Sequence, residues 1–435
     1  MLLGWNGTIH LNHRSLKTRY LGWLFGFIFL ACCSHANAAC LQTDSPASEP
    51  AANVQISPKA KELGFDVKKL GSIDRKISSL VEQGKVFGCS ALIYRKGEEI
   101  YFGKWGNQNQ RKQIPIERDT IFRIYSMSKP ITSVAAMQLV EQGKLDLKAP
   151  VSDYLPEFKD LKVLESRNGV ANEVDPKRTM KVLDLLRHTS GLSYGFFGKT
   201  AVDKQYLKNG ILLTDLNLKS MVGKLGKIPL LHHPGTQFHY SASTDVLGRV
   251  IEVASEKTFD DYLKTDLFGP LAMEDTFFNV PESKQQRLSQ LFRPNSKGDL
   301  VVANPLQSVR FLMPENEFFS GGGGLCSTID DYLKFCKMLL NSGELDGQKL
   351  LKSETVEQMF SNQLGKIERS SRSFKFGLGF RVFPQGDFGW GGMAGTRFWV
   401  HPKNETAVIF MMQITPSGQR KYGEIVREAA YAALR

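Results

Sequence analysis

Ser126 and Lys129 place a hydroxyl and an amine three residues apart, in the stretch Ser-Met-Ser-Lys. Apolar residues then recur at nearly helical spacing, at Ile131, Val134, Ala135, Leu139 and Val140. This pattern predicts a helix that begins close to Ser126. Side chains at i and i+3 share a helix face, with Cβ atoms about 5–6 Å apart. The amine can therefore reach the hydroxyl and take its proton, which is the minimum requirement for serine acyl-transfer chemistry.

The same pair also has an ordinary structural interpretation. Ser126 could cap the helix while Lys129 is solvated. A serine at a helix N-terminus lies among free backbone N–H groups, which favour developing negative charge. Two further stretches are needed to decide between these interpretations.

Tyr240 and a pair of glycines supply these stretches. Tyr240 lies in His-Tyr-Ser-Ala-Ser, directly before a second helix-like run, and a tyrosine that shuttles a proton can serve the same serine. Gly391 and Gly392 lie in Trp-Gly-Gly-Met, among late strand-like residues. An exposed N–H there could pair with that of Ser126 to hold an oxyanion. Taken singly, Tyr240 is equally typical of a half-buried tyrosine, and the glycine pair of a β-bulge.

Strand-like and helical patterns surround these motifs in a definite order. Early in the chain we expect a helix from Asp66 and strands at 90–94 and 99–102. Late in the chain we expect strands at 376–382, 388–391, 396–400 and 406–412, then a helix at 424–434. Residues from about 145 to 330 are mostly helical runs and loops, and another helix follows at 329–341. Pairing the early and late strands gives an α+β fold: an antiparallel sheet flanked by the N- and C-terminal helices, with a helical insertion at about 145–330 and a cleft beside it.

The order of the three motifs resembles that of the serine β-lactamase and penicillin-binding-protein superfamily. Within it, the chain is most similar to the class C β-lactamase-like branch, which includes the family VIII carboxylesterases. The supporting stretches are FRIYSMSKP (122–130), LLRHTSGL (185–192), YSASTDVLGRVIE (240–252), GGGGLCSTIDD (321–331) and WGGMAGT (390–396). The resemblance covers about residues 65–435 and implies one β-lactamase-like serine hydrolase domain.

The resemblance also implies a role for each motif residue. Ser126 would be the nucleophile that forms an acyl-enzyme, and Lys129 would be the base, alone or with Tyr240. Tyr240 would pass protons to the leaving group and later activate water. The backbone N–H groups of Ser126 and Met393 would form the oxyanion hole.

Two departures from the family pattern bear on the substrate. Ala242 occupies the third position of the tyrosine motif, where β-lactamases and transpeptidases usually carry asparagine. Trp390 precedes Gly391 and Gly392, where these enzymes usually carry lysine. The resemblance implies that substrate contacts all four of these residues, Ala242, Trp390, Gly391 and Gly392. Both departures resemble the esterase branch. The sequence does not fix whether Arg397 supplies the missing positive charge.

Several other candidates have weaker support. Ser193 lies in a G-x-S-x-G match without the preceding strand that this motif requires, and His188 is expected to be a structural hydrogen-bonding residue. His232, His233 and His239 lack a metal-ligand pattern, and we expect no metal or other cofactor. Aromatic residues could line an acyl pocket or belong to the core: Tyr194, Phe196, Phe197, Phe318 and Phe319. Asp245 is expected to help cap the helix after Tyr240.

The N-terminus predicts export. Three basic residues precede an eleven-residue apolar run at 21–31, and Ala36-Asn37-Ala38 fits a cleavage site. We expect a signal peptide at 1–38, a flexible lead at 39–64 and a periplasmic location, with a retained anchor or lipidation at Cys32 or Cys40 as alternatives. No later run is long enough to span a membrane.

The charge and the cysteines constrain partners only weakly. The formal charge is +12, and the three basic residues of 1–38 leave +9 for the remainder. Lysines concentrate between Lys199 and Lys227, without the signals of a nucleic-acid-binding protein. Of the cysteines after residue 38, one pair could form a disulfide, but the pairing stays open: Cys40, Cys89, Cys326 and Cys336.

The favoured function is therefore a serine hydrolase that forms an acyl-enzyme, most simply a carboxylesterase on neutral or apolar acyl esters. One alternative is a β-lactamase or D-amino-acid peptidase acting on cell-wall-type substrates. The other is a non-catalytic cell-wall-binding protein. The oligomeric state is not determined by the sequence.

Overall fold

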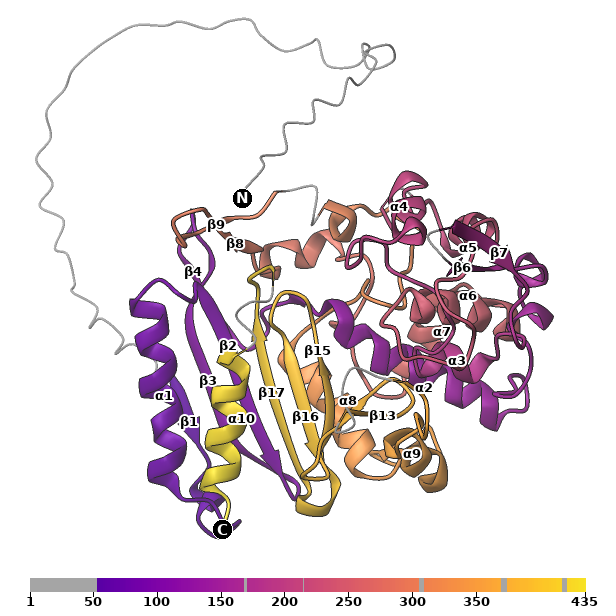
Figure 1. Cartoon of the computed structure of the whole chain (residues 1–435). Coiled ribbons are helices and arrows are strands. Elements are labelled where there is room, and N and C mark those ends of the chain that lie inside the picture. Colours follow the sequence, from indigo (N-terminus) through magenta and orange to yellow (C-terminus); the bar gives the residue numbers. More distant parts are fainter. Residues whose placement is uncertain (1–52, 168–169, 214, 305–308, 369–373, 417–420) are drawn as a thin grey trace, which may run out of the picture. The chain divides into compact units, whose positions relative to one another are not determined.

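The computed structural model describes residues 53–167, 170–213, 215–304, 309–368, 374–416 and 421–435 (Figure 1). The expected signal peptide at 1–38 and the first part of the expected lead lie outside these residues. The described end of that lead contains β1 (Val54–Ile56), which pairs with β3. The flexible lead therefore cannot extend to residue 64, because backbone hydrogen bonds to the sheet already hold β1.

A nine-stranded sheet forms one half of the molecule, in the order β1-β3-β2-β17-β16-β15-β14-β13, with β4 paired to β3. β17 pairs antiparallel with β2, so the early and late strands share one sheet, as predicted. The strands are β2 (Gly88–Arg95), β3 (Glu98–Asn109), β4 (Ile114–Pro115), β13 (Lys375–Phe376), β14 (Arg381–Val382), β15 (Phe388–Gly391), β16 (Arg397–His401) and β17 (Thr406–Met412).

The two faces of this sheet belong to two separate cores. On β17, Val408 and Phe410 face the core under the terminal helices α1 (Val67–Glu82) and α10 (Lys421–Ala433). Ile409 and Met411 face the core on the other side, toward α2 (Ser128–Glu141) and α8 (Ile329–Leu340). A strand that is covered on both faces is apolar at successive positions, which explains the unbroken apolar run from Ala407 to Met412 in β17.

A mostly helical lobe follows α2, as expected (Figure 1). Its helices are α3 (Val182–Leu186), α4 (Ala201–Lys208), α5 (Leu218–Leu225), α6 (Ser243–Ser255) and α7 (Phe259–Leu263), and α9 (Ser353–Phe360) comes later in the chain. The lobe also contains two unexpected hairpins, β6 (Val163–Arg167) with β7 (Val170–Val174), and β8 (Phe292–Pro294) with β9 (Leu300–Val302). Most of β7 is exposed, so its sequence lacks the alternation of apolar and polar residues from which a strand is predicted.

The expected single strand at 376–382 is wrong. The chain forms a hairpin there, in which β13 pairs with β14 around a tight turn. The Gly377 N–H donates to the Phe380 carbonyl at 2.8 Å, and Gly379 has a φ of +89°. Glycine adopts this conformation without steric cost, so the two glycines inside the apparent strand are the turn.

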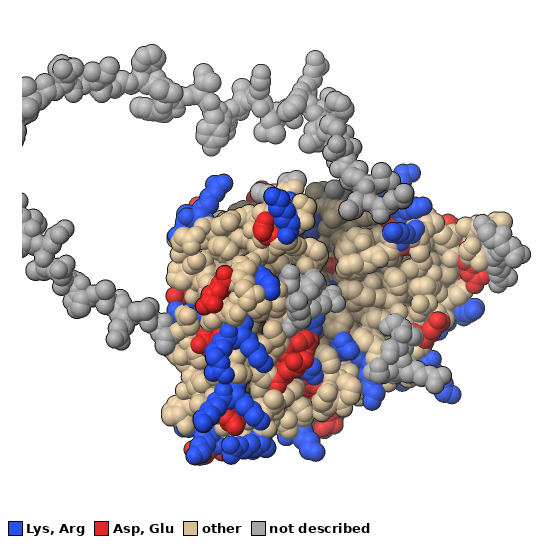
Figure 2. Space-filling view, turned by 60° about the vertical axis from the view of Figure 1, so that its left-hand side comes forward, with Lys and Arg blue, Asp and Glu red and all other residues tan. Residues whose placement is uncertain are grey.

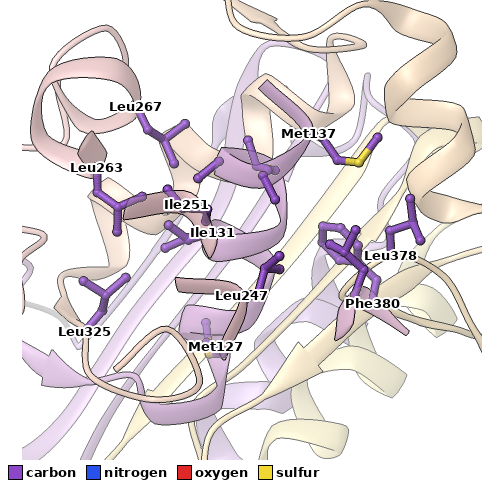
Figure 3. Close-up of a cluster of buried hydrophobic side chains, with 14 of the residues drawn as sticks. Met127, Ile131, Met137, Leu247, Ile251, Leu263, Leu267, Leu325, Leu378 and Phe380 are labelled. Carbon is purple, nitrogen blue, oxygen red and sulfur yellow. The ribbon is translucent and has the colours of Figure 1, made fainter. Parts of the chain in front are cut away.

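Helix α2 passes through the middle of the molecule. Every residue from Ser128 to Leu139 is buried. Figure 3 shows apolar side chains on both sides of it, with Ile251 and Leu263 on one side and Leu378 and Phe380 on the other. A helix packed on all sides has little freedom to shift, because interiors are close-packed. The residues at its N-terminus are therefore held in fixed positions.

Cys89, Cys326 and Cys336 are buried free thiols, and Cys40 lies outside the described residues. Among the described helices, none has the length and apolarity needed to cross a membrane. Figure 2 shows Lys and Arg side chains gathered in the lower part of one face, with fewer Asp and Glu among them.

Candidate active site

Ser126 lies in a 3-10 turn, Tyr125–Met127, directly before α2. The turn is fixed from behind because β5 (Phe122–Arg123) pairs with β10 (Cys326–Ser327), and the Ile124 N–H donates to the Leu325 carbonyl at 3.0 Å. Tyr125 has a φ of +43°, a strained conformation for a bulky residue. Such strain persists where the surrounding structure imposes it, commonly at functional sites. Here it presents Ser126, which is half-buried, at the end of a rigid helix.

Lys129 carries a buried amine toward Ser126. Its side chain is only 1% exposed. Its Nζ donates to the Gly322 carbonyl at 2.5 Å and lies 3.3 Å from Ser126 Oγ. The amine also faces the rings of Tyr194 and Tyr240, at 5.3 and 4.7 Å from their centroids. A buried amine is stable only with such partners, so Lys129 is not the solvated side chain of the alternative interpretation.

Tyr240 reaches the same oxygen from the helical lobe. Its hydroxyl donates to Ser126 Oγ at 2.8 Å. The residue lies three positions before α6 and its ring packs against those of His188, at 4.8 Å, and Trp390, at 5.5 Å. The predicted group of Ser126, Lys129 and Tyr240 therefore converges on one hydroxyl oxygen.

The glycine pair brings the late strand against the Ser126 turn. β15 ends at Gly391, and the chain then turns at Gly392. A Cβ on Gly392 would lie 2.4 Å from the Ile124 carbonyl oxygen, so only glycine permits this approach. Met393, the next residue, is 40% exposed. Gly392 is in direct contact with the turn that carries Ser126, and Met393 is the next residue. The backbone N–H of Met393 is therefore close to the position where an oxyanion-hole donor is needed.

Asp245 does not cap α6, contrary to expectation. The N-cap of α6 is Ala242, and Asp245 is buried in the first turn. Its carboxylate accepts hydrogen bonds from the Ser320 hydroxyl and from the Gly322 N–H, the latter at 3.0 Å. Burial raises the pKa of Asp245, and the nearby charge of Lys129 opposes this rise. Asp245 therefore fixes Gly322, whose carbonyl holds Lys129.

The glycines around this contact are required by space. Cβ atoms would lie 2.6 Å from the Thr244 carbonyl oxygen at Gly321 and 2.3 Å from Asp245 Oδ2 at Gly322. The run 321–324 is therefore a tightly packed turn between α2 and α6. Its link to Asp245 was not apparent from the sequence because hydrogen bonding joins residues more than seventy positions apart.

His188 and Tyr194 complete the wall behind Tyr240. Burial and the charge of Lys129 hold the pKa of His188 well below its usual range, so its imidazole is neutral. Its Nδ1 accepts a hydrogen bond from the Ser241 N–H at 3.4 Å, which agrees with the expected structural role. Burial and the charge of Asp245 raise the pKa of Tyr194 well above its usual range. Both groups therefore stay uncharged beside the site.

Ala242 and Trp390, the two departures from the β-lactamase and transpeptidase pattern, place no charged group in the site. Ala242 is fully buried. The Trp390 indole N–H donates to the Tyr240 oxygen at 3.4 Å, and its ring meets that of Phe376 edge-on at 5.3 Å. Arg397 belongs to the other face of the sheet, where it pairs with Glu424 of α10 at 3.4 Å. Arg397 therefore does not replace the positive charge that Trp390 lacks.

The chain matches a family model described as Beta-lactamase over residues 73–432. The chain belongs to the beta-lactamase family. Protein Rv1367c of Mycobacterium tuberculosis is 30% identical over 363 residues, which cover 78% of this chain and 89% of that protein. Esterase EstB of Burkholderia gladioli is 26% identical and covers 83% of this chain and 94% of its own.

A solved structure extends the comparison to the fold of this beta-lactamase-family protein. The structure of "EstCE1, a hydrolase with promiscuous acyltransferase activity" superposes with a TM-score of 0.69 at 26% identity. The match covers 86% of this chain and all of that one. Together the findings identify the chain as a serine hydrolase of the β-lactamase and penicillin-binding-protein fold, related to esterases.

Exposed aromatic side chains lie near the site in this beta-lactamase-family protein. Phe196 and Phe197 are exposed, with ring centroids 4.5 Å apart. The Phe197 ring lies 6.2 Å from that of Tyr240, and Tyr194 packs against both phenylalanines. Phe318 is buried, whereas Phe319 is half-buried and packs against Phe278. Of the aromatic candidates, Phe196 and Phe197 are placed to meet a substrate.

The other candidates have structural partners. Ser193 is buried, and its hydroxyl donates to Asp203 at 2.5 Å. His233 pairs with Glu165 at 2.8 Å, and the His232 and His239 rings pack together at 5.3 Å. Within the described part of the chain, no group of three His, Cys, Asp or Glu side chains could hold a metal ion.

Proposed function

We propose that this protein is a carboxylesterase that cleaves neutral or apolar acyl esters through an acyl-enzyme on Ser126. The observation that carries the proposal is the convergence of Lys129 Nζ and the Tyr240 hydroxyl on Ser126 Oγ, at 3.3 and 2.8 Å, beside an aromatic wall. A nucleophile within hydrogen-bonding reach of a base is the arrangement that acyl transfer requires.

The reaction has two halves. In the first, Ser126 Oγ bonds to the ester carbonyl carbon and its proton passes to the pair formed by Lys129 and Tyr240. The backbone N–H groups of Ser126 and Met393 stabilise the oxyanion. The C–O bond to the alcohol then breaks, and the pair returns the proton to the departing alkoxide. In the second half, water loses a proton to the same pair and its oxygen bonds to the acyl carbon. The bond from that carbon to Ser126 Oγ then breaks, and the pair returns the proton to Ser126 Oγ as the acid is released.

The shorter contact favours Tyr240 as the group that exchanges protons directly with Ser126. Lys129 is held mainly by the Gly322 carbonyl, at 2.5 Å. Its charge lies over the Tyr240 ring, 4.7 Å from the centroid. A cation at that position stabilises a phenolate electrostatically. Lys129 thus supports the proton exchange that Tyr240 performs.

The uncharged wall argues for a neutral substrate. A β-lactam or a D-alanyl peptide carries a carboxylate, which binds best to a cation. Trp390 supplies an indole instead, and Arg397 points to the opposite face of the sheet, paired with Glu424. The apolar rings of Phe196 and Phe197 favour an acyl chain at the mouth. EstB, an esterase, and EstCE1, a hydrolase, support the same choice.

Acyl transfer to an alcohol is a second candidate for the same acyl-enzyme. EstCE1 is described as having promiscuous acyltransferase activity. An alcohol can occupy the position of water in the second half-reaction without any change in the residues involved. Added methanol or butanol should then divert product from free acid to the new ester, as measured by gas chromatography.

Rates on two substrates test the proposal. The purified protein should hydrolyse p-nitrophenyl butyrate with a kcat/KM at least tenfold above that for nitrocefin, and Ser126→Ala should remove both activities. Faster turnover of nitrocefin would contradict the interpretation that Ala242 and Trp390 favour neutral esters over β-lactams. Ester turnover that survives Ser126→Ala would contradict the nucleophile.

A further inference from the structure

Five large apolar side chains between residues 196 and 216 project into solvent, and one of them, Phe197, lies near Tyr240 of the site. The exposed fractions are 47% for Phe196, 65% for Phe197, 48% for Leu207, 60% for Leu213 and 77% for Leu216. Scattered exposed apolar residues are normal on a protein surface. Five within twenty-one positions is a concentration of exposed apolar side chains of the kind that marks a binding surface. We refer to these five residues as the mouth patch.

Contacts connect the mouth patch to the reactive serine. Phe197 packs near Tyr240, whose hydroxyl contacts Ser126. The loop that carries the phenylalanines lies against α4, since a Cβ on Gly195 would come within 2.6 Å of Tyr206. Leu207 is the next residue of that helix, on its exposed side.

Arg310 ties the second half of the patch to the same region. Its guanidinium donates to the carbonyls of Leu212 and Leu213, at 3.2 and 3.1 Å. It also lies over the Phe318 ring, 4.5 Å from the centroid. Phe318 precedes the glycine run that holds Lys129 by three positions. The loop with Leu213 is therefore attached to the framework of the site.

The exposed charged side chains of the segment that carries the patch are all lysines. Residues 196–227 contain six lysines and two acidic residues. Both acids, Asp203 and Asp215, are buried, and Asp215 is paired with Lys224 at 2.7 Å. The remaining lysines are exposed: Lys199, Lys204, Lys208, Lys219 and Lys227. The exposed charges of this segment are thus all positive, and the exposed Glu317, which bridges to Asn217 beside Leu216, comes from another part of the chain.

Helix α4 shows both properties on one face. Val202, Asp203 and Tyr206 are buried, while Lys204, Leu207 and Lys208 are exposed. Lysines beside exposed apolar residues are typical of segments that lie at a membrane surface, where the apolar groups enter the interface and the lysines contact anionic headgroups.

We propose that the mouth patch and its lysines dock the enzyme on an anionic lipid surface, with the Phe197 side of the site directed at the lipid. Apolar contact and charge complementarity both select this partner over neutral vesicles. Binding itself is independent of the proposed esterase chemistry. A second consequence, that acyl esters dissolved in the lipid reach Ser126 directly, rests on the proposed function.

Vesicle sedimentation tests the docking surface. The protein lacking residues 1–38 should be used, because the apolar run at 21–31 would otherwise insert into lipid, and residues 52–435 form a compact unit without it. The Ser126→Ala form should sediment with phosphatidylglycerol vesicles at 50 mM NaCl. Binding should weaken at least tenfold with phosphatidylcholine vesicles or at 500 mM NaCl.

Two double variants in the patch region, each with a matched control double variant elsewhere, locate the surface. Lys204→Glu/Lys208→Glu should weaken binding by about tenfold or more, at roughly fivefold per lysine. Arg75→Glu/Lys76→Glu on α1 changes the net charge equally and should have little effect. Leu213→Asp/Leu216→Asp should weaken binding, whereas Val67→Asp/Val170→Asp, at 44% and 59% exposed positions, should not.

The outcomes separate docking from chemistry. Absence of binding to anionic vesicles, or equal losses in the patch and control variants, would overturn the docking proposal. A concentration-dependent dimer that Leu213→Asp/Leu216→Asp abolishes, without vesicle binding, would assign the patch to a second copy instead. Turnover of soluble p-nitrophenyl butyrate should be unchanged in the Leu213→Asp/Leu216→Asp variant. If the unsubstituted protein did not hydrolyse this ester, that result would contradict the esterase proposal and leave the docking proposal standing.

Discussion

The Tyr240 hydroxyl lies 2.8 Å from Ser126 Oγ, although 114 positions separate the two residues. Ser126 lies in the turn directly before the central helix α2, and Tyr240 belongs to the helical lobe. The Trp390 indole N–H, from the sheet, lies 3.4 Å from the same phenol oxygen. Three parts of the chain thus meet at one proton-exchange site.

Tyr240→Phe tests this contact. Phenylalanine keeps the ring contacts with His188 and Trp390 but removes the hydroxyl, so the fold should persist while proton exchange fails. We expect kcat on p-nitrophenyl butyrate to fall about 10²–10⁴-fold, with an unchanged melting temperature. A rate close to that of the unsubstituted enzyme would leave Lys129 as the only base.

Asp245 is expected to position Lys129 through Gly322. Asp245→Ala leaves the buried Ser320 hydroxyl and Gly322 N–H without their acceptor, at a cost of about 2–4 kcal/mol in the free energy of unfolding. It should also lower kcat, because the Gly322 carbonyl is released. Asp245→Asn retains an acceptor oxygen and should keep most of both properties. Equal losses in the two variants, by urea denaturation and ester hydrolysis, would argue against this role.

Trp390→Lys should shift substrate preference toward carboxylates. A cation at this position would face the site beside Tyr240, where a β-lactam carboxylate could pair with it. We expect the ratio of kcat/KM for nitrocefin to that for p-nitrophenyl butyrate to rise about tenfold or more, with Trp390→Phe as the uncharged control. An unchanged ratio would mean that this residue does not set the preference.

His188 should make the fold less stable in mild acid. Burial and the charge of Lys129 lower its pKa in the folded state. An unfolded histidine binds a proton below about pH 6.5, so below that pH the unfolded chain binds more protons. The free energy of unfolding should therefore fall as pH decreases from about 6.5, by up to about 1.4 kcal/mol per pH unit.

His188→Asn isolates this contribution. Asparagine tolerates the φ of +56° and offers an acceptor to the Ser241 N–H. Urea denaturation between pH 7.5 and 5.0 should show a smaller loss of stability in the variant than in the unsubstituted protein. Parallel curves would show that His188 does not titrate between the folded and unfolded states.

Ser193→Ala should leave the activity intact. The G-x-S-x-G match places Ser193 in a buried hydrogen bond to Asp203 rather than beside Lys129 or Tyr240. We expect kcat within about twofold of the unsubstituted enzyme, with a loss of stability of about 0.5–1.5 kcal/mol from that bond. Loss of esterase activity in the soluble, folded variant would reopen the choice of nucleophile.

Local patterns in the sequence were sufficient for much of the fold. The strand expected at 406–412 has those bounds in the structure, and the helix expected at 329–341 ends one residue earlier, at Leu340. Both have apolar residues that face a core, so burial leaves a periodic or continuous signal. β7 leaves none because it is exposed, and the strand expected at 376–382 concealed a turn at Gly379.

The parts of the site that depend on distant contacts were not predictable. Asp245 looked like a helix cap, since nothing near it in sequence indicates Ser320 or Gly322 as partners. The direction of Arg397 depends on the register of β16, which sets the face that each residue occupies. The motif residues Ser126 and Lys129 were visible because a single helical turn joins them.

Covalent labelling of Ser126 tests the central claim most directly. After reaction with a fluorophosphonate, intact-mass and peptide analysis should find one adduct, on the peptide that contains Ser126. Labelling should disappear in Ser126→Ala and persist in Ser193→Ala. An adduct on another residue, or labelling of folded Ser126→Ala at an undiminished rate, would contradict the account.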